Sequence, residues 1–328
     1  MVTTPSLDEL RAAAEVVYRD LPPTPQYAWP LLSARAGCEV WVKHENHTPI
    51  GAFKVRGGLV YMDDLRRSRP EVTGVISATH GNHGQSVAFA ATRAGLAATL
   101  VVPHGNSVEK NAAMRAFGAE LVVEGHDFQA ALEHARERAA GDGLHFVESY
   151  HRLLVKGVAS YSLELLESVA GLDAVYVPIG LGSGISAMIA ARDGLGLKTE
   201  VVGVCSAHAP TYALSFAKGE PVSTNSTDTL ADGMACRVPV AEAVEVINAR
   251  AARVVTVTDE EIKAAMRALY QDTHNLAEGA GAAAFAALLQ ERDRMAGKKV
   301  AVVISGGNID RDLYMEILSE PDGPPPAT

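Results

Sequence analysis

The chain has 328 residues, enough for one large domain or two smaller ones with substantial cores. Its 39 acidic residues outnumber its 29 basic ones, giving a formal net charge of −10 at pH 7. An acidic chain with no run rich in lysine and arginine is a poor candidate for binding nucleic acid. The longest apolar run, Ala280 to Leu289, is too short to span a bilayer and predicts a packed helix of small residues. We therefore expect neither a nucleic acid nor a membrane as a partner.

The N-terminus and the cysteines indicate the compartment. Acidic side chains stand where a signal peptide would need an apolar segment, at Asp8, Glu9 and Glu15. Three cysteines occur without the spacing of a metal or redox site: Cys38, Cys205 and Cys236. Buried free thiols are expected, which suits a reducing compartment, so the sequence predicts a cytoplasmic protein.

Along the chain, short runs rich in β-branched residues alternate with longer alanine-rich segments. The predicted strands are 39–43, 74–77, 98–102, 120–123, 145–147, 174–178, 200–205, 253–256 and 299–304. Several are nearly continuous apolar runs, as in parallel strands that are covered on both faces. Ser6 to Glu9 and Thr258 to Glu261 each fit the capping box that begins a helix. This alternation predicts an α/β fold with parallel sheets.

The first motif with chemical content is "HENHTPIGAFKVRGG", His44 to Gly58. It places Lys54 between Phe53 and Val55, with glycines close by. An amine becomes a nucleophile only when deprotonated, and apolar surroundings lower its pKa. The glycines would let a flat ligand approach the backbone. Lys54 is therefore a candidate reactive amine, and the alternative is a lysine that extends its charge into solvent from a helix start.

The second motif is "SATHGNHGQSVAFAA", Ser77 to Ala91, in which a strand leads through a polar glycine loop into a helix. Backbone N–H groups converge on an anion at such a helix start, and a carboxylate is a suitable guest. The residues placed there are Thr79, His80, Gly81, Asn82 and His83. The two histidines are not a strong ligand pattern, so no metal is expected. The alternative is a capped helix with no further role.

The third motif is "AVYVPIGLGSGISAMIAA", Ala174 to Ala191. A strand leads into a loop of small residues and then a helix, an arrangement that binds phosphate through backbone N–H groups. The loop residues are Gly180, Leu181, Gly182, Ser183 and Gly184. Their spacing departs from the dinucleotide fingerprint, because the third glycine comes one residue early. A single phosphate is therefore the expected ligand.

The fourth motif is "VAVVISGGNID", Val300 to Asp310, where a predicted strand ends at Ser305 and Gly306. Ligands of open α/β sheets bind beyond the carboxyl ends of the strands, so the Ser305 hydroxyl is expected to face the site. A turn without a further role is the alternative.

Six motifs in this order resemble the serine/threonine dehydratases, a family of pyridoxal phosphate enzymes that also includes serine racemase. They are "GAFKVRGG" at 51–58, "HGNHGQ" at 80–85, "GLGSGI" at 180–185, "ADG" at 231–233, "EGAGA" at 278–282 and "SGGNID" at 305–310. The resemblance spans nearly the whole chain. It implies pyridoxal 5′-phosphate as the cofactor.

The family's fold is α/β, with two open, twisted, mostly parallel sheets flanked by helices, the fold type II that resembles the β subunit of tryptophan synthase. The resemblance implies a large cofactor-binding domain made of 1–65 and 152–328, and a small mobile domain of 66–151. It also implies a homodimer or homotetramer.

The resemblance assigns roles residue by residue. Lys54 would bind the cofactor covalently and, once released, take the substrate's α-proton. Phe53 would pack beside the cofactor ring, Asn82 would bind its hydroxyl, and Ser305 with Gly306 would lie at the pyridine nitrogen. The phosphate would bind at Gly180, Leu181, Gly182, Ser183 and Gly184. The substrate would bind at Thr79, His80, Gly81, Asn82 and His83.

The implied activity is that of an ammonia-lyase, or dehydratase, which converts L-threonine or L-serine to a 2-oxo acid and ammonia. A bulkier substrate such as phenylserine or a hydroxyectoine derivative, and serine racemase-like activity, are alternatives. His80 stands where the racemase has its second base, so efficient racemisation is not expected. Racemase-like members bind a cation where this chain has Cys205 and Thr211, so no metal is expected. A dinucleotide oxidoreductase and a non-catalytic binding protein remain as other classes.

Overall fold

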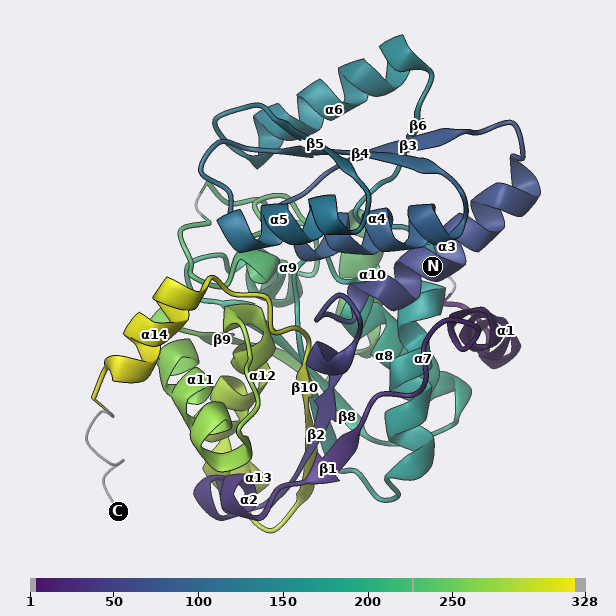
Figure 1. Ribbon diagram of the computed structural model, residues 1–328. Coiled ribbons are helices and arrows are strands. Elements are labelled where there is room, and N and C mark those ends of the chain that lie inside the picture. Colours follow the sequence, from purple (N-terminus) through teal and green to yellow (C-terminus); the bar gives the residue numbers. More distant parts are fainter. Residues whose placement is uncertain (1–3, 226, 322–328) are drawn as a thin grey trace. The chain divides into compact units, whose positions relative to one another are not determined.

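The computed structural model describes residues 4–225 and 227–321, and its packing divides the chain into two compact units (Figure 1). The first unit comprises Met1–Thr24, His47–Ser168 and Leu181–Leu197. The second comprises Pro25–Asn46, Val169–Gly180 and Lys198–Thr328. This division differs from the expected one, because segments assigned to the large domain pack with residues 66–151. The expected domains, with a mobile small domain, stay a prediction.

The first unit is built on a four-stranded sheet with the order β5-β4-β3-β6, in which every pairing is parallel. Its strands are β3 (Gly74–Ala78), β4 (Ala97–Val102), β5 (Glu120–Val123) and β6 (His145–Phe146). Its helices are α1 (Leu7–Val17), α3 (Lys54–Ser68), α4 (Asn82–Arg93), α5 (Val108–Ala116), α6 (Phe128–Asp142), α7 (Arg152–Ser168) and α8 (Ser183–Gly194). Helix α6 covers one face of the sheet, and α4 and α5 cover the other (Figure 1).

The second unit is built on a six-stranded sheet with the order β1-β2-β10-β7-β8-β9. Its strands are β1 (Gln26–Ala28), β2 (Glu39–His44), β7 (Ala174–Pro178), β8 (Glu200–Ser206), β9 (Arg253–Val257) and β10 (Lys299–Ile304). Only β1 is antiparallel to its neighbour among these described strands. The helical segments are α2 (Pro30–Ala36), α9 (Thr211–Lys218), α10 (Ala241–Arg250), α11 (Asp259–Thr273), α12 (Gly279–Gln290), α13 (Arg292–Met295) and α14 (Arg311–Ser319), with short 3-10 turns η1 (Glu45–His47) and η2 (Asp232–Met234).

Most predicted elements are confirmed. All nine predicted strands are present, with ends that differ by no more than one residue. The alanine-rich run is the buried helix α12, which packs against β10 and β7. Strand β1 was not predicted. Its three residues lie at a sheet edge and include no apolar run, so period-two patterning could not reveal it.

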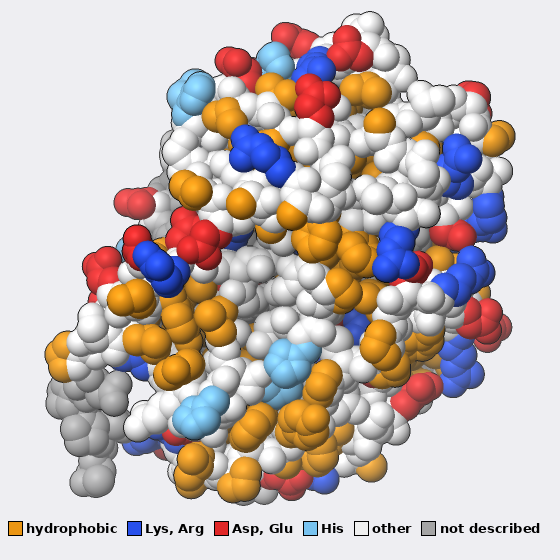
Figure 2. Space-filling view, viewed as in Figure 1, with side chains coloured by type: hydrophobic (Ala, Val, Ile, Leu, Met, Phe, Trp, Pro, Cys, Tyr) orange, Lys and Arg blue, Asp and Glu red, His pale blue; other side chains and the backbone are white. Residues whose placement is uncertain are grey.

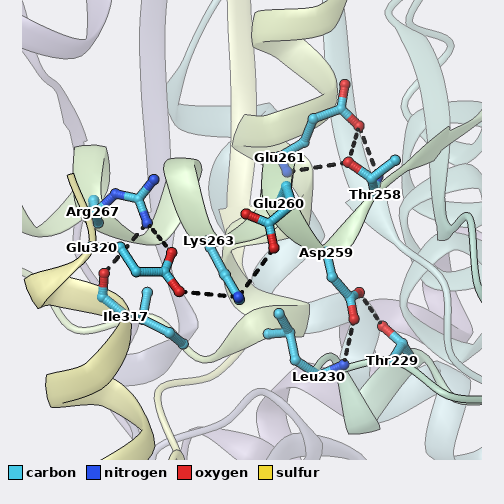
Figure 3. Close-up of polar contacts among 10 residues, drawn as sticks. All are labelled: Thr229, Leu230, Thr258, Asp259, Glu260, Glu261, Lys263, Arg267, Ile317 and Glu320. Carbon is cyan, nitrogen blue, oxygen red and sulfur yellow. Dashed lines mark hydrogen bonds and ion pairs between the residues drawn. The ribbon is translucent and has the colours of Figure 1, made fainter. Parts of the chain in front are cut away.

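Both capping boxes are also present, and the second one anchors a neighbouring loop (Figure 3). At the start of α11, Thr258 and Glu261 exchange hydrogen bonds between side chain and backbone. Asp259, the residue after Thr258, accepts hydrogen bonds from the Thr229 hydroxyl at 2.6 Å and from the Leu230 amide at 3.0 Å. Helix α11 therefore holds the segment that leads into the "ADG" motif.

The surface carries charges of both signs, with some exposed apolar side chains between them. Figure 2 shows hydrophobic side chains gathered over α14, where Leu313 and Met315 are 40% and 60% exposed. Within residues 4–225 and 227–321, no helix is long and apolar enough to cross a membrane.

Candidate active site

Lys54 is the first residue of helix α3, and the ring of Phe53 lies beside its amine. The side chain is half-buried, and Nζ lies 4.8 Å from the centre of the Phe53 ring. That ring in turn packs edge-on against Tyr161 of α7, with 6.1 Å between the ring centres. The Lys54 carbonyl accepts a hydrogen bond from the Ser86 hydroxyl of α4 at 2.6 Å. The reactive amine candidate thus begins a helix whose first turn is tied to a neighbouring helix.

The two glycines after Lys54, Gly57 and Gly58, serve helix packing, and the approach of a flat ligand to the glycines near Lys54 stays a prediction. A Cβ on Gly57 would lie 2.9 Å from the Leu154 carbonyl of α7. A Cβ on Gly58 would collide with the Ser86 side chain of α4. Both glycines therefore let α3 approach its two neighbours closely, which places Lys54 with respect to α4.

A buried ion pair holds the first turn of α3, and the sequence reasoning did not identify it. Arg56 is completely buried, and its guanidinium binds both carboxylate oxygens of Glu164 in α7, at 2.6 Å and 3.1 Å. It also donates to the hydroxyls of Ser160 and Thr24. The Tyr18 hydroxyl donates to the same carboxylate, and burial raises the tyrosine pKa above its usual range. An arginine in an otherwise apolar helix segment was the available signal.

Thr79 shapes the loop between β3 and α4. Its hydroxyl oxygen accepts hydrogen bonds from the amides of Gly81 at 2.9 Å and Gly84 at 3.0 Å. The hydroxyl hydrogen remains available to donate to a ligand. A Cβ on Gly81 would press against the buried side chain of Lys110 in α5, so the loop has no room for a larger residue. The Gly81 amide is thus engaged by Thr79 and is a weaker candidate for binding a carboxylate than sequence alone suggested.

The first residues of α4 are Asn82 and His83, whose amides belong to the helix turn that no intrahelical carbonyl can reach. This is the geometry that favours an anion. His83 is 8% exposed, and burial together with the Lys54 ammonium lowers the pKa of its imidazole to about 3. The imidazole is therefore neutral at pH 7. His80 is half-buried and stacks on Phe128 of α6, with ring centres 5.3 Å apart and 28° between the planes.

The loop before α8 is shaped by backbone rather than by side chains. Gly182 is the N-cap of α8 and has φ of 98°, in the left-handed region that favours glycine. Ser183 and Gly184 form the buried first turn of the helix, with the amide ends toward the loop. Gly180 belongs to the second unit, where an added Cβ would collide with the Gly233 carbonyl. The "ADG" motif therefore packs against Gly180, a contact that only the structure revealed.

Ser305 and Gly306 follow β10 directly, at the carboxyl end of the strand, and Ser305 is buried. The Gly306 carbonyl accepts from the Glu278 amide at 3.1 Å and lies where a Cβ on Gly281 would be. The "EGAGA" motif at the start of α12 thus fixes the position of Gly306. Gly281 is required by this close approach to the Gly306 carbonyl.

The structure places the predicted residues in two sets. The first unit contains Phe53, Lys54, Thr79, His80, Gly81, Asn82, His83, Leu181, Gly182, Ser183 and Gly184; the second contains Gly180, Ser305 and Gly306. Within the first unit, α3 and α4 pack side by side and bring Lys54 next to the Thr79–His83 loop (Figure 1). The roles assigned to these residues stay predictions.

The three cysteines are buried free thiols, as expected. Burial raises the pKa of the Cys205 thiol to about 12. The Thr211 hydroxyl bonds the Cys236 carbonyl at 2.6 Å and the Thr224 hydroxyl at 3.0 Å, so it serves packing. No group of three or more histidine, cysteine or acidic side chains suited to a metal occurs among the described residues.

Comparison with known proteins decides the family. The family model described as "Pyridoxal-phosphate dependent enzyme" matches residues 17–306. The chain belongs to this family. Two curated relatives are L-threonine ammonia-lyase of Thermotoga maritima, 34% identical over 88% of this chain and 72% of the relative, and L-threo-3-hydroxyaspartate ammonia-lyase of Saccharomyces cerevisiae, 30% identical over 92% and 93%. A similar solved structure is the processed form of threonine deaminase isoform 2 from Solanum lycopersicum, with a TM-score of 0.88 and 28% identity over 97% of this chain and 94% of that one.

These findings confirm three expectations from the sequence. The fold is α/β with two mostly parallel sheets flanked by helices, the type II fold of this family. The cofactor is pyridoxal phosphate. The enzyme is a pyridoxal-phosphate-dependent lyase.

Proposed function

We propose that this enzyme is an ammonia-lyase that converts L-threonine or L-serine to the corresponding 2-oxo acid and ammonia. The observation that carries the proposal is Lys54, a half-buried amine beside an aromatic ring at the position of the family's reactive lysine. The names of two curated relatives, both L-threonine ammonia-lyases, support this reaction, and a third relative is named as an ammonia-lyase of another 3-hydroxy amino acid.

The chain's residues fit pyridoxal phosphate. The loop of Gly180 to Gly184 is the candidate phosphate site, because Gly182 takes a left-handed conformation and the first turn of α8 follows at once. Lys54 and Phe53 provide an amine and an aromatic face for the ring, and Asn82 provides an amide for its hydroxyl. We assign Ser305 and Gly306 to the pyridine nitrogen. A serine there does not force the nitrogen to stay protonated, unlike an aspartate.

When bound, pyridoxal phosphate supplies the electron sink that accepts the electron pair of the broken Cα–H bond. The chain's own work is to orient the substrate and move protons. The first turn of α4 and the Thr79 hydroxyl bind the substrate carboxylate. The Lys54 amine takes the α-proton, and its half-buried setting beside Phe53 limits competition from water. The 3-hydroxyl would then leave as water with the proton that Lys54 has taken, and the released enamine would tautomerise and react with water to give the 2-oxo acid and ammonia.

The identity of the 3-hydroxy amino acid depends on the segment Ser206 to Phe216. Part of this segment serves packing, because Thr211 and Ser215 are buried and bonded to neighbouring backbone. Its exposed residues are Ala207, His208 and Leu214. Bulkier 3-hydroxy amino acids, among them phenylserine and hydroxyectoine-derived substrates, are the alternatives.

The test is an assay for 2-oxo acid across a panel of L-serine, L-threonine, phenylserine and L-threo-3-hydroxyaspartate, with cofactor-free protein as the control. We expect the highest kcat/KM with L-threonine or L-serine. Absence of 2-oxo acid from every member of the panel, in protein that binds the cofactor, would contradict the proposed reaction.

Racemisation is the competing activity, and His80 is the residue on which it depends. Its imidazole stacks on Phe128, which holds it against α6. We propose that His80 shapes the carboxylate loop and does not act as a second base. Incubation of L-serine in deuterated water, with chiral analysis of the remaining substrate, tests this. We expect little D-serine; its accumulation at a rate comparable to elimination, abolished in His80→Ala, would make His80 a base.

We also propose that the enzyme acts in the cytoplasm as a homodimer or homotetramer on a small-molecule amino acid. The three buried free thiols and the acidic net charge support a reducing compartment and no nucleic acid partner. Light scattering of the purified protein tests the assembly, and a monomer at micromolar concentration would contradict it.

A further inference from the structure

The imidazole of His83 has a polar atom that the family assignment does not explain. His83 is the second residue of α4 and is 8% exposed. Its Nε2 is fully buried and has no hydrogen-bond partner among the described residues. A buried polar nitrogen without a partner is unfavourable and uncommon in folded proteins. The partnerless Nε2 therefore suggests that another group forms a hydrogen bond with it during function.

The neighbouring backbone determines which nitrogen of His83 carries the hydrogen. The ring donates to the Val147 carbonyl, and because Nε2 has no partner, the donor is Nδ1. A carbonyl only accepts, and the Val147 amide already donates to Ile76 at 2.9 Å. The same carbonyl also accepts from the Ser77 hydroxyl at 2.8 Å. In the neutral ring, Nε2 is then a lone pair, an acceptor only.

Because Nε2 of His83 is an acceptor, it cannot bind the substrate carboxylate that the sequence analysis assigned to this residue. A carboxylate offers lone pairs alone, so it would be repelled by Nε2. The His83 amide, in the first turn of α4, is still suited to the carboxylate. Nε2 of the His83 side chain instead needs a hydrogen-bond donor as its partner.

The position of His83 on α4 indicates the donor. His83 and Ser86 are three residues apart and so share one face of the helix. Ser86 donates to the Lys54 carbonyl, and it fills the space beside Gly58 in α3. The face that carries His83 is thus the face whose Ser86 packs on the start of α3. Lys54 also supplies the charge that acts on the His83 ring.

We propose that Nε2 of His83 accepts a hydrogen from the Lys54 amino group when that amine is free to take the α-proton. His83 is then a positioning residue, which restricts the rotation of a flexible lysine side chain. The role of Lys54 in this inference rests on the proposed function.

Nitrogen NMR of the full-length protein, labelled with ¹⁵N-histidine, tests the contact directly. The sample is loaded with cofactor and saturated with L-alanine. The amine of L-alanine competes with the Lys54 amine for the cofactor, and L-alanine has no 3-hydroxyl to lose. The His83 signals are assigned by their absence from His83→Asn. We expect a protonated Nδ1 and an unprotonated Nε2 with the shift of a hydrogen-bonded acceptor. In Lys54→Ala, only Nε2 should move toward the shift of a free acceptor. A protonated Nε2, or the same Nε2 shift in both proteins, would overturn the proposal.

A pair of substitutions separates positioning from structure. His83→Asn keeps an amide N–H near the position of Nδ1 but has no group that reaches as far as Nε2. His83→Gln brings an amide oxygen to the reach of Nε2. We expect kcat of His83→Asn to fall roughly tenfold to hundredfold with KM little changed, because a misplaced base slows proton removal. The kinetic isotope effect with 2-deuterated substrate should rise as well. His83→Gln should recover most of kcat.

The control is His126→Phe, which removes a largely exposed imidazole from the same unit and should leave kcat unchanged. Equal kcat and equal isotope effects in the Asn and Gln variants would overturn the positioning role. If the wild-type protein forms no 2-oxo acid, the proposed function fails, and the NMR experiment still decides the contact.

Discussion

Two strand–loop–helix junctions carry most of the predicted site, and they are built in opposite ways. Between β3 and α4, side chains form the loop: Thr79 caps two amides, His80 stacks on Phe128, and His83 is buried beside the start of α3. Between β7 and α8, the loop is nearly free of side chains, and Gly180 and Gly182 are required by close approach and by φ. Both junctions end at a helix N-terminus.

The difference indicates what each junction recognises. A phosphate keeps its charge and shape, so backbone amides at a helix start are enough to bind it. A substrate that undergoes proton transfer needs a group that can take and return a proton, and titratable side chains provide such groups. We therefore expect backbone groups to do the binding in the "GLGSG" loop and side chains to contribute to it in the "THGNH" loop.

The largest effect should come from Lys54→Ala, which removes the amine beside the side-chain-rich junction. We expect turnover to fall roughly a thousandfold or more, because Lys54 is the residue to which we assign removal of the α-proton. The assay is 2-oxo acid formation, with circular dichroism as the control for folding. Near-normal turnover in a folded variant would remove Lys54 from the mechanism.

Gly182→Asp tests the backbone-built junction. The carboxylate would oppose the phosphate at the α8 N-terminus, and an L side chain is strained at φ of 98°. We expect cofactor affinity to fall on the order of a hundredfold or more, measured by titration of cofactor-free protein. Gly182→Asn is the matched control, since asparagine tolerates the left-handed region and has no charge. Equal affinity for Gly182→Asp and wild type would place the phosphate elsewhere.

Thr79→Val tests the side-chain-built junction with a substitution of nearly the same shape. Two buried amides, of Gly81 and Gly84, would lose their acceptor, and the ligand would lose a donor. We expect kcat/KM to fall by about tenfold to hundredfold, which corresponds to about 1–3 kcal/mol for groups left without partners. Thr79→Ser keeps the hydroxyl and should stay within a few-fold of wild type. If valine and serine behave alike, the hydroxyl has no part in the loop.

The smallest effect concerns helix α1, which packs on α7 and α8. A hydrogen bond from Lys156 of α7, with contributions from Ser6 and Arg152, lowers the pKa of Glu9 from 4.5 to about 2. Because the folded-state pKa is lowered, this stabilisation is present above about pH 4.5 and is lost as the pH falls toward 2. The carboxylate of Glu9 is 39% exposed, and solvent weakens its ion pairs. We therefore expect it to contribute less than about 1 kcal/mol to the free energy of unfolding.

Glu9→Gln isolates this charge, because glutamine still fits the capping box with Ser6. Urea unfolding of wild type and Glu9→Gln at pH 7 and at pH 2.5 measures the difference in their free energies of unfolding. This difference should be smaller at pH 2.5. A difference that grows as the pH falls would contradict the assigned pKa shift.

The sequence by itself determined the elements and the cofactor chemistry. Apolar runs identified nine strands, capping boxes identified two helix starts, and ordered motifs placed Lys54, the Thr79–His83 loop and the Gly180–Gly184 loop. These features are local, and each depends on residues that are neighbours in the chain.

Only the tertiary structure decided which distant groups meet. It showed that Gly57 and Gly58 serve the packing of α3, and that Arg56 pairs with Glu164 more than a hundred residues away. It also brought the His83 ring to the backbone of Val147 and left its Nε2 without a partner among the described residues. Such contacts depend on which helix faces arrive side by side, and no periodicity within one segment encodes that. The side chains that surround the start of α3 therefore became visible only when α3, α4 and α7 were packed together.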